Sequence, residues 1–253
     1  MDFLTNFNNT VSNLWNNGEI MKAYIVSLCA PSSIEDNEGV LDTRARLEHQ
    51  LKDITTIQNT GQLNGRFVKD LVDPPDYEKC VKFQLVRKYA KEYGLLYLVD
   101  VGCFSGWVGR ALAVEGIKVV GIDVHPVMLY MAAHLAAGTL ADFECISAMK
   151  IGYVHPKTYS GAIVFDVLEH LADPINALKS IDRSVRENGW VFINVPSPKG
   201  EIGAGRFDIE SHEHLYCFSK KRLDELCGHK KNYELKEIIN EDGLPNWFLK
   251  YQL

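Results

Sequence analysis

The chain has 253 residues, of which 46% are hydrophobic and 24% are charged, and its formal net charge at pH 7 is −6. This length and composition predict one soluble globular domain with an appendage. The acidic balance and the lack of a dense Lys/Arg tract argue against an extended nucleic-acid face. No apolar stretch approaches the length of a membrane span, the first residues do not resemble a signal peptide, and the six scattered cysteines suggest neither a zinc knuckle nor a disulfide framework, so we expect a cytoplasmic protein.

The N-terminal third carries no chemical motif. Its pattern predicts helices over 3–15, 20–28, 40–57 and 77–93. We expect residues 1–80 to form a helical segment that serves as a substrate lid or as an oligomerisation arm, and residues 81–253 to form the domain that carries the site. The sequence does not predict an oligomeric state.

Residues 97–123 combine a strand, a glycine loop, a helix, a second strand and an acid. The apolar run 95–101 is typical of a strand that is buried on both faces of a parallel sheet. Gly102 and Gly106 allow the backbone to approach a ligand, and the start of the following helix offers unpaired N–H groups. Asp123 ends the second strand, 21 residues after Gly102, where a carboxylate can accept both hydroxyls of a ribose. The unit therefore predicts a site for a nucleoside-containing cofactor.

The glycine loop lacks the three glycines of the G-x-G-x-x-G dinucleotide fingerprint. Its sequence at 100–106, DVGCFSG, instead resembles the D-x-G-x-x-x-G first motif of class I S-adenosylmethionine (SAM)-dependent methyltransferases. The resemblance implies that this loop faces the amino-acid end of SAM and that Asp123 holds the ribose. By itself, a two-glycine loop is also compatible with a plain structural turn.

A helix at 126–137 and strands at 143–149 and 161–166 are predicted next. Methyltransferases of this class often carry an acid near the end of strand three that meets the adenine amino group, but residues 147–150 read Ser-Ala-Met-Lys. Adenine would then be held by backbone groups and by packing against Met149. The cofactor-binding residues that the resemblance implies are Asp100, Gly102, Cys103, Phe104, Gly106, Asp123, Val124, Ala148, Met149 and Asp166.

The string FDVLEHLADP follows the fourth strand. It resembles the corresponding segment of the methyltransferase group that includes ubiquinone-biosynthesis O-methyltransferases and many sugar and small-molecule methyltransferases. Its polar residues Asp166, Glu169 and His170 stand at the carboxyl end of a central strand, where ligands of open α/β sheets bind. Glu169 and His170 could instead cap or bridge the following helix.

The same three residues are the candidates for a metal site. In ubiquinone-type relatives an acid-x-x-Glu-His run resembles a divalent-metal site, so Asp166, Glu169 and His170 could coordinate Mg²⁺ by that analogy. Hard cations prefer more oxygen ligands than this motif offers. We therefore expect no metal.

A long connection from Pro196 to His214 contains several glycines and predicts a substrate lid. It ends in HEHLYCFS, which is similar to the H-x-H-x-x-x-F-S/T segment of the same methyltransferase group. Two histidines at i and i+2 lie on one side of an extended chain, which could suit a metal. We prefer a histidine as the proton acceptor that faces the substrate: His214 first, then His212 or His170.

Strands at 190–195, 233–239 and 247–252 complete the pattern, with a helix at 174–185. The expected fold class is α/β: a Rossmann-like, doubly wound seven-stranded sheet, mostly parallel with an antiparallel last strand, plus an N-terminal helical segment. The resemblance implies a SAM-dependent methyltransferase that acts on a hydroxyl, nitrogen or carbon of a small molecule or glycan. Two alternatives stay open: an NAD or nucleotide-sugar enzyme with the same sheet, and a non-catalytic SAM-binding partner subunit.

Overall fold

The structure, a computed structural model, describes residues 76–204, 214–240 and 242–253. These residues belong to one compact unit that extends over 75–253. The helices expected at 3–15, 20–28 and 40–57, nearly all of the segment 1–80, and His212 lie outside the described residues, so the expectations for them stay predictions.

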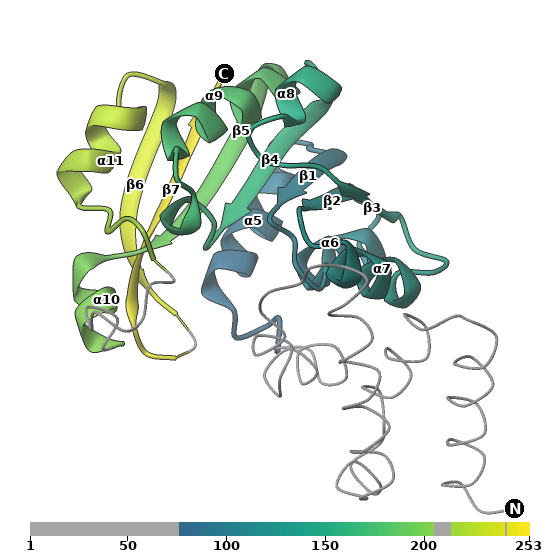
Figure 1. The fold of residues 1–253 in the computed structure, drawn as a ribbon, viewed down its shortest axis with the longest axis horizontal. Coiled ribbons are helices and arrows are strands. Elements are labelled where there is room, and N and C mark those ends of the chain that lie inside the picture. Colours follow the sequence, from purple (N-terminus) through teal and green to yellow (C-terminus); the bar gives the residue numbers. More distant parts are fainter. Residues whose placement is uncertain (1–75, 205–213, 241) are drawn as a thin grey trace, which may run out of the picture. The chain divides into compact units, whose positions relative to one another are not determined.

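The described elements alternate between strands and helices along the chain (Figure 1). In chain order they are α5 (Val81–Glu92), β1 (Tyr97–Val101), α6 (Trp107–Val114), β2 (Lys118–Asp123), α7 (Pro126–Leu135), β3 (Ala141–Cys145), α8 (Ile151–Val154), β4 (Tyr159–Phe165), the 3₁₀ turn η2 (Leu168–His170), α9 (Pro174–Ser184), β5 (Val185–Pro196), α10 (Pro198–Gly203), α11 (Lys220–Cys227), β6 (Lys231–Ile239) and β7 (Pro245–Gln252).

The seven strands form one sheet in the order β3-β2-β1-β4-β5-β7-β6. Strands β1 to β5 pair in parallel, whereas β7 runs antiparallel to both of its neighbours, β5 and β6. The strand order reverses between β1 and β4, which is the point where open α/β sheets bind ligands beyond the carboxyl ends of their strands. The predicted fold class, with its antiparallel last strand, is confirmed.

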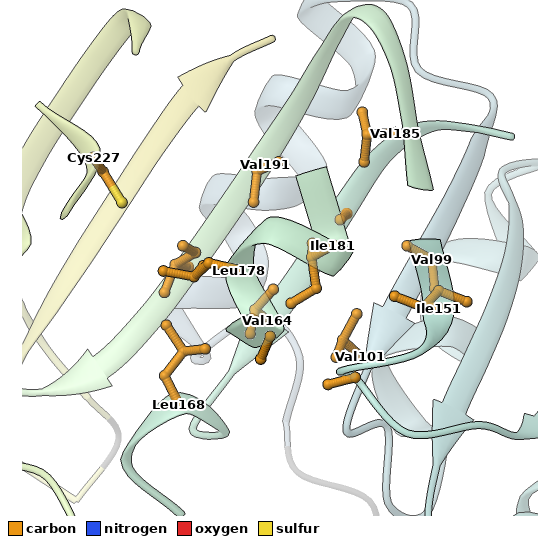
Figure 2. Packing of buried hydrophobic residues seen from close by; sticks show 14 of the residues in the cluster. Val99, Val101, Ile151, Val164, Leu168, Leu178, Ile181, Val185, Val191 and Cys227 are labelled. Atoms are coloured by element: carbon orange, nitrogen blue, oxygen red, sulfur yellow. The ribbon is translucent and has the colours of Figure 1, made fainter. Parts of the chain in front are cut away.

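Both faces of the sheet are covered by helices. On one face α8, α9 and α11 pack on the strands, and Figure 2 shows Leu178 and Ile181 of α9 among Val164 of β4 and Val191 of β5. On the other face α5 and α6 cover a second cluster, which includes Phe83, Val86, Leu112, Ile163 and Phe192. Burying each such side chain stabilises the fold by about 1.5–3 kcal/mol. No helix in the described part of the chain is long and apolar enough to cross a membrane.

Several elements differ from the expectations. The helix expected over 77–93 begins at Val81, the strand expected over 190–195 begins at Val185, and the short helix α8 was not predicted. The third strand ends at Cys145 rather than at Met149, because a turn with a Lys150 N–H to Ser147 C=O hydrogen bond leads into α8. The connection after Pro196 begins with a helix, α10, rather than with an irregular loop. Ser197 caps this helix by accepting a hydrogen bond from the Gly200 N–H (3.1 Å), and a proline occupies its first turn.

Candidate active site

The glycine loop between β1 and α6 needs its glycines at two places. Gly102 and Gly106 have φ angles of 68° and 69°, in the left-handed region that side chains disfavour. A Cβ on Gly102 would overlap the side chain of Val167, and one on Gly106 would overlap the ring of Phe143. Gly106 is also the N-cap of α6, whose N-terminus no described side chain caps. The first N–H groups of α6 are therefore available to a ligand.

Asp123, at the end of β2, holds this loop in place. Its Oδ2 accepts a hydrogen bond from the backbone N–H of Phe104 (3.0 Å), and its Oδ1 accepts one from the N–H of His125 (3.0 Å). A carboxylate oxygen has room for more than one donor. Both oxygens can therefore also accept the hydroxyl groups of a ribose while the carboxylate keeps its orientation.

Asp100 and Cys103 lie beneath the loop and are buried. Burial raises the pKa of Asp100 to about 8, the charge of Asp123 adds to this effect, and the Gly109 N–H only partly opposes it. In the part of the chain that the structure describes, the Oδ2 of Asp100 has no hydrogen-bond partner. Burial likewise raises the pKa of the Cys103 thiol far above its ordinary range. Both groups are thus protonated at neutral pH, and Cys103 is not a nucleophile.

Replacing Asp100 with asparagine should flatten the pH dependence of stability. In the native protein the pKa of Asp100 is raised from 3.8 to about 8, so the folded state binds more protons than the unfolded state between these values. The contribution of Asp100 is therefore fully present below the unfolded pKa and is lost as pH rises toward 8. Urea unfolding at a series of pH values should show that the free energy of unfolding falls less between pH 4 and 8 in Asp100→Asn than in the wild type. An equal fall in both proteins would contradict the raised pKa of Asp100.

The residues expected near adenine lie at the carboxyl ends of β2 and β3. Val124 directly follows Asp123 and is 66% exposed, which is unusual for a side chain of its type. Ala148 and Met149 lie in the turn after β3, where the Met149 N–H donates to the Ser147 hydroxyl (3.3 Å) and Met149 packs against the core. Since β2 and β3 are parallel neighbours, these residues share the sheet edge with Asp123.

Asp166, directly after β4, is fixed by two partners from other elements. Its Oδ2 pairs with the ammonium of Lys82 on α5, and its Oδ1 accepts a hydrogen bond from the Asn194 amide (2.7 Å) on β5. It also has a left-handed backbone, with φ 53°. The sequence analysis predicted neither Lys82 nor Asn194 as a partner of Asp166. The only signal for Lys82 was its position four residues before Val86, which places a charged side chain on the apolar face of α5.

Glu169, His170 and His214 come together although they belong to separate motifs. The Glu169 carbonyl accepts hydrogen bonds from the N–H groups of Leu215 (2.7 Å) and Tyr216 (3.1 Å). The rings of His170 and His214 meet edge-on, with their centroids 4.6 Å apart. The alternative role of Glu169 and His170 as helix caps is wrong, because the Asp173 carboxylate caps α9. The structure therefore joins the two predicted histidine-containing segments into one cluster.

The His214 ring has a carboxylate partner that the sequence analysis missed. Its Nδ1 lies 2.7 Å from Oε1 of Glu201 on α10, and the two side chains are only 10% and 4% exposed. The nearby Glu169 is fully buried, and neither of its carboxyl oxygens has a hydrogen-bond partner among the described residues. Burial raises the pKa of Glu169 well above its usual range, and the charges of Asp166 and Glu201 add to this effect.

The structure does not group the three metal candidates as expected. The described residues whose ligand atoms come within 4.8 Å of one another are Glu169, His170 and His214, whereas Asp166 is held by Lys82. One oxygen and two imidazole nitrogens form a set that suits Zn²⁺ better than Mg²⁺. The raised pKa of Glu169 in addition disfavours the deprotonated form in which a carboxylate binds a metal.

A protein-family model described as a methyltransferase domain matches residues 59–238. The chain belongs to this family. The family resemblance of the glycine loop, of FDVLEHLADP and of HEHLYCFS is thereby confirmed. The glycine loop and FDVLEHLADP follow the parallel strands β1 and β4 and meet where Gly102 packs on Val167. The described part of HEHLYCFS joins them through the Leu215 and Tyr216 N–H groups, which donate to the Glu169 carbonyl.

Curated proteins that are similar to the chain include several named ubiquinone biosynthesis O-methyltransferase. The protein from Nitrosomonas europaea is 32% identical over 151 residues, which cover 58% of this chain and 63% of the relative. The protein from Thiobacillus denitrificans is 34% identical over 99 residues, which cover 38% of this chain and 43% of the relative. The chain thus matches less than two thirds of the length of these relatives.

Solved structures share the fold at low sequence identity. The plantazolicin methyltransferase BamL, determined with a triazolic desmethylPZN analog and SAH, superposes with a TM-score of 0.58 and 12% identity, over 80% of this chain and 93% of that chain. The 1,6-didemethyltoxoflavin-N1-methyltransferase of Burkholderia thailandensis gives a TM-score of 0.54 and 16% identity, over 77% and 88% of the two chains. These matches support the Rossmann-like architecture.

Proposed function

We propose that the chain binds SAM at the carboxyl edge of β1, β2 and β3 and transfers its methyl group to a hydroxyl of a small molecule or glycan, with His214 as proton acceptor. The observation that carries this proposal is the convergence of the glycine loop, Asp123 and the His170–His214 cluster at one sheet edge. Family membership and the names of the O-methyltransferase relatives support it.

The residues at this edge fit SAM. Gly102 and Gly106 give the loop the left-handed turns that its close packing on Val167 and Phe143 requires, Asp123 presents two acceptor oxygens, and Val124 exposes apolar surface next to them. When bound, SAM supplies an electrophilic sulfonium methyl that an acceptor oxygen can displace in line. The protein's contribution is then to align the acceptor and to exclude water.

His214 is the group best placed to take the proton of the acceptor hydroxyl. As the new O–C bond forms, the C–S bond breaks with its electron pair going to sulfur, and the hydroxyl proton moves to an imidazole nitrogen. Histidine suits this step because its pKa ordinarily lies near neutral pH. His170, which contacts the His214 ring, is the second candidate. His212, the other second candidate, lies outside the described residues.

Transfer of a labelled methyl group tests the proposal. The purified chain is incubated with SAM that carries a radioactive methyl group and with phenols, catechols, sugars and amines in parallel. We expect label in the methyl ether of a hydroxyl acceptor. SAM binding without transfer to any acceptor would instead favour the non-catalytic partner subunit, and binding of NAD in place of SAM would favour the dinucleotide enzyme.

Removal of divalent metals should leave the reaction unaffected. Among the described carboxyl groups near the two histidines, Asp166 is paired with Lys82 and Glu201 is hydrogen-bonded to His214. Burial raises the pKa of Glu169 and so disfavours the deprotonated form that a metal needs. Dialysis against EDTA is therefore expected to leave kcat unchanged. A loss of activity that Mg²⁺ or Zn²⁺ restores would show that Glu169 and His170 hold a metal.

A further inference from the structure

Glu201 lies on a helix that is fixed rigidly to the sheet. At the start of α10 the Ser197 N–H and hydroxyl both donate to the Pro245 carbonyl of β7, at 3.2 and 2.8 Å. Gly200 packs so closely on the same residue that a Cβ there would overlap the Pro245 carbonyl oxygen. The position of the Glu201 carboxylate beside His214 is therefore fixed by the contacts of α10 with β7.

The contact between Glu201 and His214 determines where the imidazole proton lies. An ionised carboxylate can only accept a hydrogen bond, so the Nδ1 that lies 2.7 Å from Oε1 of Glu201 must carry a proton. In a neutral imidazole the other nitrogen, Nε2, then has the free lone pair. That lone pair is what a base needs in order to take the proton of a hydroxyl group.

We propose that Glu201 is a positioning residue that holds His214 in the Nδ1–H form and fixes its ring, so that Nε2 can accept the proton of the methyl acceptor. This inference rests on the proposed function for the role of His214. Burial supports it, because a carboxylate that is 4% exposed needs a hydrogen-bond donor, and the Nδ1–H of His214 is such a donor in the described part of the chain. Glu201 acts through His214 and need not touch the substrate.

Glu201→Gln is the variant that separates this role from simple packing. Glutamine has nearly the same shape but no charge, and it can turn either its NH₂ group or its carbonyl oxygen toward Nδ1, so it no longer enforces the Nδ1–H form. Molecules in which the NH₂ group donates to Nδ1 carry the imidazole proton on Nε2 and lack the base. We expect kcat to fall by about 100-fold or more, the lower range of general-base effects, while SAM affinity stays unchanged. As a control, Glu187→Gln changes an exposed carboxylate near the amino end of β5 and should leave kcat unchanged.

The tautomer itself can be measured without any activity assay. Nitrogen-15 NMR of the histidine side chains, with the His214 signal assigned by its loss in His214→Gln, should show Nδ1–H in the wild type and an increased share of Nε2–H in Glu201→Gln. The chain provides a second pair, His155 with Glu144 at 2.8 Å, so Glu144→Gln should leave the His214 signals unchanged.

Three outcomes decide between the claims. Nε2–H in the wild type, or no change of tautomer in a folded Glu201→Gln protein, would overturn the positioning role of Glu201. A changed tautomer with an unchanged kcat would instead overturn the base role of His214 in the proposed function. A changed tautomer together with a lowered kcat and a retained melting temperature is the result that the proposal predicts.

Discussion

Replacing His214 with alanine should lower kcat by about 100-fold or more, because positioned general bases contribute at least that factor. The affinity for SAM should stay nearly intact, since Asp123 and the glycine loop lie on other elements. Titration with SAM and steady-state kinetics of the same preparation measure the two quantities. An unchanged kcat would contradict the role of His214.

Two further variants make this test specific. Alanine leaves the buried Glu201 without its partner and could lower stability. His214→Gln avoids this problem, because the glutamine amide can still donate to Glu201 although it cannot act as a base. His229→Ala removes an exposed histidine after α11 and should change neither kcat nor stability.

Replacing Gly106 with alanine should destabilise the fold by about 3 kcal/mol. The change places a side chain on a residue with a left-handed backbone conformation and also creates a steric overlap. Gly106, at the start of α6, has a φ of 69°, and a Cβ added there would overlap the ring of Phe143 on β3. Moving either the ring or the helix also displaces the loop, so SAM affinity should fall as well. Urea unfolding and calorimetric titration measure both effects.

Gly116→Ala is the matched control for this variant. Gly116 also has a positive φ, 85°, but a Cβ there would meet no atom within 4 Å. We expect a cost of about 1 kcal/mol, from the backbone conformation alone, and an unchanged affinity for SAM. If Gly106→Ala and Gly116→Ala lowered the free energy of unfolding by the same amount, the close approach of the Phe143 ring to Gly106 would not contribute to stability.

The sequence predicted the sheet well because buried parallel strands have a local signature. Strand β4, with six of its seven residues buried, is a nearly continuous apolar run, and the acids that follow β2 and β4 are adjacent to their strands in the chain. Strand β3 was placed too late because it lies at the edge of the sheet and is only partly buried. Its weaker pattern allowed the error.

The predicted part of the site consists of residues that belong to local motifs, whereas the missed residues act at long range. Lys82 meets Asp166 across 84 positions of the chain, and no local pattern relates the two. Glu201 lies in a stretch with glycines at 200 and 203 that indicated a loop, although Ser197 and Pro198 form an ordinary helix start. Partners of this kind depend on the fold and become visible only in three dimensions.

The central claim is that the edge beside β1 and β2 binds SAM, and calorimetric titration tests it most directly. The wild-type chain is titrated with SAM, with S-adenosylhomocysteine and with NAD, and Asp123→Ala is titrated in parallel. Asp142→Ala, which removes an exposed carboxylate from β3, is the control. Loss of Asp123 also removes the acceptor of the Phe104 and His125 N–H groups, so melting temperatures are recorded for each variant.

We predict that SAM and S-adenosylhomocysteine bind, that NAD does not, and that Asp123→Ala weakens SAM binding tenfold or more, which corresponds to about 1.4 kcal/mol. Asp142→Ala should bind as the wild type does. A folded wild-type chain that binds neither SAM nor S-adenosylhomocysteine would contradict the account, and the glycine loop would then be a structural turn or a site for another nucleotide.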